Sequence, residues 1–263
     1  MIDCHCHILP NIDDGSNSME ESIKMAKIAK DKGTKTIIST SHFYDTNMFV
    51  TGKKLEESLE LFREKLEEHN IDLEILLGNE AYMSPELPKY IEERKVYTLN
   101  NSKYLLVELP LLEMPMYTFE VLYELKLMGI IPIMAHPERY TYVMDNPNLV
   151  YDFIDKGALI QLNGGSIRGR FGDETQRIAN DLLNHNMVHI IGSDGHGYNS
   201  RRPVLDKSYS LVKEKLGKDY AEELFSINPK RVLENKNITI KDPIKIEEKT
   251  TFIKKISKLL KIG

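Results

Sequence analysis

The chain opens with two imidazoles placed two residues apart, His5 and His7, in the stretch 1–7. Successive side chains of a β-strand alternate between its two faces. A strand here would therefore project both histidines together and turn Cys4 and Cys6 away. Neutral imidazoles that converge from one strand end are common metal ligands. An acidic pair follows at 13–14. From these residues alone, a metal site and a strand end with two exposed histidines are both open.

The elements that would position such residues follow a regular pattern. Short apolar, β-branched runs alternate with amphipathic stretches, which is typical of βα units and a mainly parallel sheet. The first helix begins with the capping box of Ser18 and Glu21 and ends at Gly33. Further helices are predicted near 55–66, 119–128, 149–155 and 229–233. Strands are predicted at 1–7, 36–40, 73–77, 104–107, 131–134, 158–162 and 188–191.

Six of these seven predicted strands end in His, Glu or Asp, and the sixth in sequence ends in a Gly-Gly turn. In a βα barrel the carboxyl ends of all strands meet at one face, where active sites form. The recurrence therefore favours a metal site over scattered surface residues, and the number of candidates suits two or three ions rather than one. The candidate ligands are His5, His7, Asp14, His42, Glu80, Glu108, His136, Asp194 and His196.

Composition narrows the class of protein. A chain of 263 residues with 41% apolar and 29% charged residues can form one barrel-sized domain. The net charge of −5 argues against a general nucleic-acid binder. Two cysteines make no disulfide framework, no apolar run reaches the roughly 18 residues of a membrane span, and no signal peptide is visible. We expect a cytoplasmic protein.

Several motifs follow one another along the chain. They are Asp3-Cys4-His5-Cys6-His7, Asp13-Asp14-Gly15, Ser41-His42, Gly78-Asn79-Glu80, Glu108, Ala135-His136-Pro137-Glu138-Arg139-Tyr140, Asn163-Gly164-Gly165-Ser166 and Ser193-Asp194-Gly195-His196. In this order they resemble the polymerase-and-histidinol-phosphatase (PHP) superfamily. Within it, the stretches 8–15 and 136–140 are similar to the bacterial manganese-dependent tyrosine-protein phosphatases of the CpsB/YwqE type. The match runs from residue 1 to about residue 235, so it is more specific than any single motif.

The resemblance implies a single PHP phosphatase domain over residues 1–240, folded as a distorted (β/α)7 TIM-like barrel. It also implies a three-ion manganese centre. One ion would be held by His5, His7 and Asp194 with a bridging Glu80, a second by Glu80, Glu108 and His136, and a third by Asp14, His42 and His196. Arg139 and Arg201 match the phosphate-contacting arginines, and the adjacent Arg202 is an alternative to Arg201.

The implied substrate is phosphotyrosine on a membrane-associated bacterial tyrosine kinase that regulates capsular or exopolysaccharide synthesis. Imidazole and carboxylate ligands also suit iron or zinc. A hydroxide bridging two ions would attack phosphorus in line. A cysteine-dependent phosphatase needs an Arg six residues after its Cys, but Pro10 and Ile12 occupy those positions, and no strand ends in Asp-x-Asp for a phosphoaspartate route.

Two alternatives stay open. One is another PHP phosphomonoesterase, such as a histidinol-phosphate phosphatase, although short loops after Glu108 and His136 favour a wide mouth. The other is a non-catalytic, metal-stabilised scaffold, although none of the nine ligands is missing. The tail at 241–263 is basic and amphipathic, and its stretch 251–262 reads as a helix. This helix either lies on the inner face of an anionic membrane, docks on the barrel, or frays.

Overall fold

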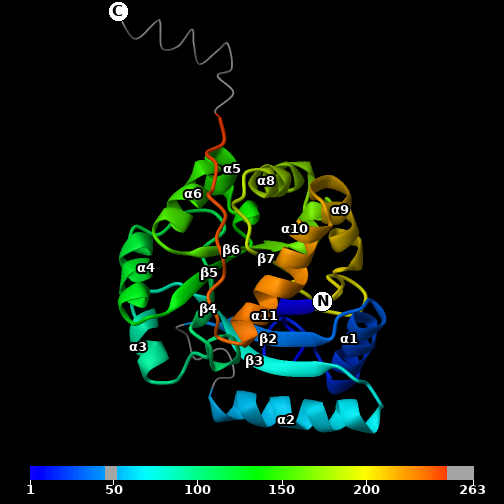
Figure 1. The fold of residues 1–263 in the computed structure, drawn as a ribbon. Helices are drawn as coiled ribbons and strands as arrows, with labels where there is room; N and C mark the ends of the chain where they lie inside the picture. Colours follow the sequence, from blue (N-terminus) through cyan, green and yellow to red (C-terminus); the bar gives the residue numbers. More distant parts are fainter. Residues whose placement is uncertain (45–51, 248–263) are drawn as a thin grey trace, which may run out of the picture.

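The computed structural model describes residues 1–44 and 52–247. Seven parallel strands follow one another around a barrel in sequence order (Figure 1). A bridge between Cys6 and Gly195 brings the first strand beside the last and nearly closes the barrel. The strands are β1 (Ile2–Cys6), β2 (Thr36–Phe43), β3 (Glu74–Tyr82), β4 (Tyr104–Glu108), β5 (Ile131–Ala135), β6 (Leu159–Asn163) and β7 (Ile190–Gly192).

Helices connect the strands and cover the outside of the barrel, so the predicted α/β barrel is confirmed. Ser18 caps the first helix by accepting a hydrogen bond from the Glu21 N–H, as predicted. The helices include α1 (Met19–Asp31), α2 (Lys53–Glu68), α3 (Leu87–Glu92), α4 (Thr118–Leu127), α5 (Thr141–Asp145), α6 (Asn148–Asp155), α7 (Gly164–Ile167), α8 (Asp173–Asn184), α9 (Asp206–Leu216), α10 (Lys218–Glu222) and α11 (Asn228–Leu233), with short turns η1 (Leu99–Asn101), η2 (Pro137–Arg139) and η3 (Glu223–Ile227). No helix among the described residues is long and apolar enough to cross a membrane.

The inward positions of the strands change character along their length. On β2 the buried Ile38 precedes His42 by four residues, and on β4 Leu106 precedes Glu108 by two. Because inward positions recur every second residue, the apolar and the polar side chains belong to the same face of each strand. The first part of each strand therefore fills the barrel interior, and its carboxyl end delivers the polar groups.

The prediction that both cysteines turn away from the histidines is wrong for Cys4. The register of β1 against β2 shifts between Asp3 and Cys6, which marks a bulge. Cys6 packs in the outer cluster with α1 and α2, whereas Cys4 packs in the barrel interior with Ile38 and Ile190. The bulge thus places Cys4 and the two histidines on the inner side of the same strand.

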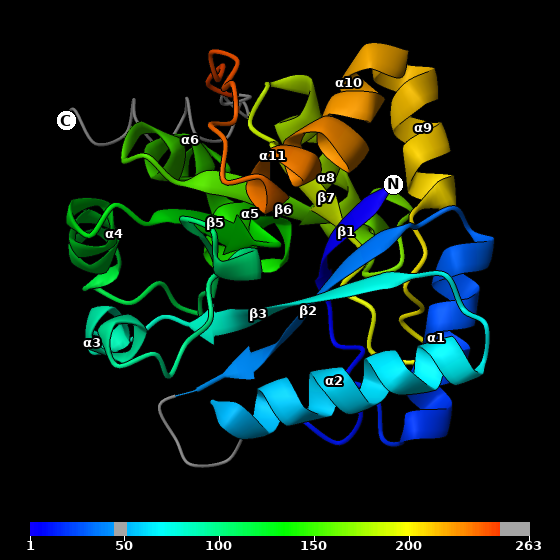
Figure 2. The ribbon, with the colours of Figure 1, turned by 60° about the horizontal axis from the view of Figure 1, so that its bottom comes forward.

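A segment after α11, residues 235–247, crosses the end of the barrel where the strands begin, and we call it the strap (Figure 2). The Tyr104 hydroxyl donates to the Lys236 carbonyl at 2.7 Å and accepts from the Ile238 N–H at 3.2 Å. Farther along, the Ile244 N–H donates to the His185 carbonyl at 2.9 Å. The strap therefore closes this end of the barrel. The predicted amphipathic stretch of the tail, 251–262, lies outside the described residues.

Candidate metal centre

All nine predicted ligands lie together at the carboxyl ends of the strands or in the loops that follow them. Glu80 lies at their centre. Its Oε2 is 3.1 Å from His5 Nε2, 3.2 Å from His7 Nε2 and 3.2 Å from His42 Nδ1. Its Oε1 is 2.9 Å from His136 Nε2. One buried carboxylate thus contacts four imidazoles, which arrive from β1 and the residue that follows it, from β2 and from the turn after β5.

Three groups of these side chains could each hold one ion, because their donor atoms lie within 4.8 Å of one another. His136 and Asp194 complete the cluster. His136 Nε2 is 3.6 Å from Glu108 Oε1, and Asp194 Oδ1 is 3.5 Å from His5 Nε2. The groups are His5, His7 and Glu80; His42, Glu80 and Glu108; and His7, Asp14, His42 and His196.

The hydrogen bonds of His5 and His7 select the tautomers that would bind a cation between the two rings. His7 Nδ1 lies 2.7 Å from the Asp13 carboxylate, which can only accept, so this nitrogen carries the proton. His5 Nδ1 lies 2.9 Å from Gln161 Oε1, and the amide nitrogen of Gln161 donates to the Leu162 carbonyl. In the neutral form, which is the one that binds a metal ion, both Nε2 atoms therefore present lone pairs, and they lie only 3.2 Å apart. Two facing lone pairs repel each other, and a bound cation would remove that repulsion.

The carboxylates of the site influence each other's ionisation. Burial opposes the ionisation of Glu80, but the imidazoles of His5 and His42 outweigh it and hold the pKa of Glu80 well below its usual value. Burial and the nearby negative charge of Glu80 raise the pKa of Glu108 instead. Burial also lowers the pKa of His42 to about 4. The imidazole is therefore neutral at pH 7, which is the form that binds metal ions.

Asp194 connects this cluster to two arginines. Its Oδ2 accepts hydrogen bonds from Asn163 Nδ2 at 2.6 Å and Arg139 Nη1 at 3.2 Å, and its Oδ1 accepts from Arg201 Nη2 at 2.7 Å. Burial opposes the ionisation of Asp194, yet His5 and Arg201 hold the pKa of this carboxyl far below its usual range. The adjacent Arg202 is exposed, and among the described residues it forms no ion pair with Asp194. Arg201 rather than Arg202 thus faces the cluster.

The backbone at the site is held in uncommon conformations. His136, Asp194 and Arg201 have φ values of 35°, 51° and 44°, in the left-handed region that non-glycine residues seldom occupy. Close packing also restricts the sequence behind His5. A Cβ added at Gly192 would lie 2.6 Å from the His5 Cβ, so β7 can approach β1 only with a glycine there.

Sequence reasoning overlooked the residues that orient the ligands. Asp13 and Gln161 hold His7 and His5, and Asn163 holds Asp194. A signal for Gln161 was present, because a glutamine interrupts the otherwise apolar run of β6. Asp13 had no such signal, since either member of the acidic pair at 13–14 could have faced the histidines.

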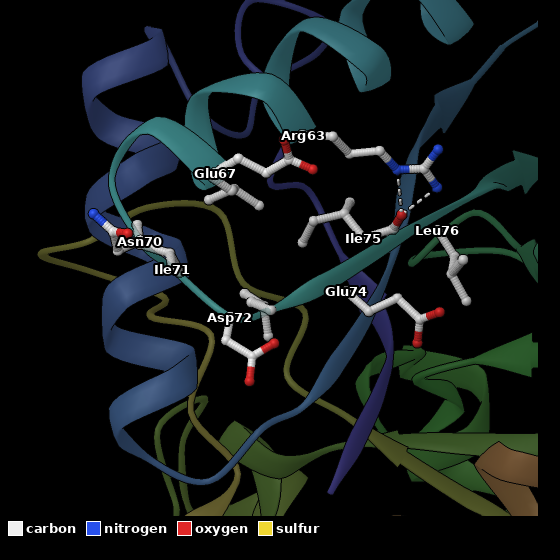
Figure 3. A pocket seen from close by; sticks show the side chains of 10 residues that line it. Arg63, Glu67, Asn70, Ile71, Asp72, Glu74, Ile75 and Leu76 are labelled. Atoms are coloured by element: carbon white, nitrogen blue, oxygen red, sulfur yellow. Dashed lines mark hydrogen bonds between the residues drawn. The ribbon is translucent and has the colours of Figure 1, made fainter.

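A cavity of about 710 Å³ lies elsewhere, between the end of α2 and the start of β3 (Figure 3). Arg63 spans it and donates from Nε to the Ile75 carbonyl at 2.9 Å. None of the nine predicted ligands lines this cavity, so the cavity is separate from the candidate metal centre despite its size.

The fold and the cluster define a seven-stranded α/β barrel with a candidate multinuclear metal centre. Residues 1–234 match the family of capsular polysaccharide synthesis proteins CpsB/CapC. The chain belongs to this family.

Relatives with curated names and solved structures agree with this assignment. The tyrosine-protein phosphatase YwqE of Bacillus subtilis is 32% identical, over 96% of this chain and 99% of its own length. The tyrosine-protein phosphatase CpsB of Streptococcus pneumoniae is 32% identical, over 89% of this chain and 98% of its own. A chain from the crystal structures of YwqE and CpsB, described as metal-dependent tyrosine phosphatases, matches with a TM-score of 0.91 and 32% identity, covering 94% of this chain and 100% of that chain. A lactonase of Listeria monocytogenes, at 14% identity and a TM-score of 0.53, covering 92% of this chain and 95% of that one, shares the fold alone.

Proposed function

We propose that this protein is a metal-dependent tyrosine-protein phosphatase of capsular or exopolysaccharide synthesis. One observation carries the proposal: nine candidate ligands and two arginines converge at the carboxyl end of a barrel whose relatives over almost the whole chain are named tyrosine-protein phosphatases. We propose phosphotyrosine on a membrane-associated bacterial tyrosine kinase as the substrate.

We propose that the nine residues hold three manganese ions. The donors fit such ions, since imidazole and carboxylate ligation suits manganese, and also iron or zinc, better than a soft metal. A cation would relieve the repulsion between the Nε2 lone pairs of neutral His5 and His7, and it would offset the negative charge of Glu80 beside Glu108, which together with burial raises the pKa of Glu108. When bound, divalent ions at this place would supply Lewis acidity and lower the pKa of water towards about 7.

The arginines would bind and orient the phosphate. Arg139 and Arg201 both contact Asp194 through one nitrogen, and their side chains stay 21% and 28% exposed, so each guanidinium keeps further N–H groups for a phosphate. A planar guanidinium can donate two parallel hydrogen bonds to a phosphate. The leaving phenolate has a pKa near 10, so the reaction does not depend on a strong general acid.

The surface beside the metal centre suits a polypeptide substrate. The loop from β4 to α4 presents Leu112 at 79% and Met116 at 100% exposure, next to the strand that ends in Glu108. Exposed apolar side chains at the edge of a site are typical of surfaces that contact another protein. A small polar metabolite would gain nothing from them.

The test compares three substrates under one condition. Purified protein with manganese is given a phosphotyrosine peptide, the same peptide with phosphoserine, and histidinol phosphate. We expect turnover of the phosphotyrosine peptide to exceed the other two, and removal of metal by a chelator to abolish it. Preferred turnover of histidinol phosphate would support the phosphomonoesterase alternative. No turnover of any substrate would support a scaffold.

A further inference from the structure

The arginines of this chain are distributed unevenly. Nine of its 35 basic residues are arginines, and five of those nine lie in three segments at the carboxyl end of the barrel. The segments 136–140, 164–172 and 193–205 contain no lysine, although lysine predominates elsewhere. Arginine binds planar or tetrahedral oxyanions in a bidentate way that lysine cannot reproduce. Arg139 and Arg201 belong to the metal centre, and the other three are Arg168, Arg170 and Arg202.

Packing contacts join Arg170 and Arg168 to the metal centre, and Arg202 follows Arg201 directly in the sequence. The guanidinium of Arg139 lies over the Phe171 ring, with Cζ 4.8 Å from the ring centroid. Phe171 and the Arg170 Cδ both pack against Gly165, where an added Cβ would meet them at 2.9 and 3.4 Å. Arg168 is half-buried, and its Nε donates to the Gly164 carbonyl at 3.1 Å. Short packing contacts thus lead from Arg139 to Arg170.

The outer arginines have no directly paired carboxylate. In the part of the chain that the structure describes, no carboxylate lies within 4 Å of the guanidinium groups of these three residues. Burial lowers the pKa of Arg168, and the positive charges of Arg170 and Arg202 lower it further, against an opposite contribution from Asp206. Asp206 itself pairs with Lys32 at 3.4 Å. Positive charge without a direct carboxylate partner beside a reactive site favours an anionic partner.

We propose that Arg168, Arg170 and Arg202 form a second anion-binding surface, which binds an acidic group of the substrate polypeptide beside the phosphotyrosine. The acidic group is an Asp or Glu carboxylate or a second phosphate, since both oxyanions fit a guanidinium. This inference rests on the proposed function and adds a preference among phosphotyrosine sequences. Arg170 and Arg202 are exposed, so the surface is open to a bound chain.

The experiment measures, for each variant, the ratio of kcat/KM for an acidic peptide to kcat/KM for a neutral peptide. Three phosphotyrosine peptides carry neutral neighbours, glutamates, or a second phosphotyrosine, and kcat/KM is measured for each. We expect the full-length protein to prefer both acidic peptides by about 3- to 10-fold, because exposed charge pairs contribute modestly and act mainly on association. Arg170→Ala with Arg202→Ala should reduce this ratio to about 1, and 0.5 M salt should do the same. Lys126→Ala with Lys213→Ala, at two exposed lysines on α4 and α9, is the matched control and should keep the ratio.

A binding measurement separates this inference from the proposed function. Versions of the three peptides with phosphonomethyl-phenylalanine in place of the target phosphotyrosine cannot be hydrolysed there, and their affinities need no turnover. Tighter binding of the acidic versions, lost in the arginine double variant, supports the surface even if no peptide is hydrolysed. Equal affinity for acidic and neutral versions overturns it, even if phosphotyrosine is hydrolysed well. A preference for the second phosphate alone restricts the surface to phosphate.

Discussion

The two ends of the barrel satisfy their polar groups in opposite ways. At the carboxyl end, the His5 and His7 Nε2 atoms face each other at 3.2 Å, and burial beside Glu80 raises the pKa of Glu108. At the amino end, Tyr104 uses its hydroxyl both as donor and as acceptor to the strap. A bound cation would therefore relieve the charge of one end, whereas at the other end Tyr104 is paired by the chain itself. Stability and reactivity are separated along one barrel axis.

The strongest way to test this comparison is to remove one ligand. His136→Ala deletes an imidazole whose Nε2 lies 2.9 Å from Glu80 Oε1. We expect turnover to fall by at least about 10³-fold, because the metal ions supply charge neutralisation and an activated water. Bound metal, measured by elemental analysis, should fall from two or three ions per chain, while circular dichroism should report an intact barrel. At most one ion per chain in the unaltered protein would contradict the three-ion centre.

A smaller effect is expected from the arginine that contacts Asp194. Arg139→Ala removes one preorganised donor and should lower kcat by about 10²–10³-fold. Metal content should not change. Arg139→Lys is the matched variant, because it keeps the charge and loses the planar fork, and we expect it to recover little activity. Normal turnover by Arg139→Ala would contradict its role in phosphate binding and leave Arg201 as the candidate.

The smallest effect concerns the amino end and depends on pH. His189 accepts a hydrogen bond from the Ile160 N–H, and burial lowers its pKa to about 4. The unfolded chain, with a histidine pKa near 6.5, then binds more protons than the folded chain between these values. The contribution of His189 to the free energy of unfolding is therefore fully present above about pH 6.5. This contribution falls by about 3 kcal/mol in total as the pH decreases towards 4.

The measurement compares urea unfolding of the unaltered protein and His189→Gln at pH 7 and pH 5. Histidines at the metal centre also titrate, and the difference between the two proteins cancels them. The stability advantage of the unaltered protein should shrink by about 2 kcal/mol between the two values. His69→Gln, at an exposed histidine, is the control and should give a constant difference. If the difference between the unaltered protein and His189→Gln were also the same at both pH values, burial would not lower the pKa of this imidazole.

The sequence predicted the barrel and its reactive end well, because both depend on local patterns. An apolar run that ends in His42, Glu80 or Glu108 predicts both a strand and the polar side chain at its carboxyl end. The bulge that turns Cys4 inward was not predictable, since it depends on the register between β1 and β2 rather than on the residues of β1 alone. The strap has no periodic pattern, and its path follows from partners such as Tyr104 and His185, which are distant in the sequence.

The strap also bears on the order in which the fold can be completed during synthesis. It contacts β4 through Tyr104, and the side-chain amide of Asn148 at the start of α6 exchanges two hydrogen bonds with the backbone of Ile246, at 3.0 and 2.9 Å. Because residues 235–247 leave the ribosome after every strand of the barrel, these contacts form after the strands have been synthesised. The closed end of the barrel is therefore completed last.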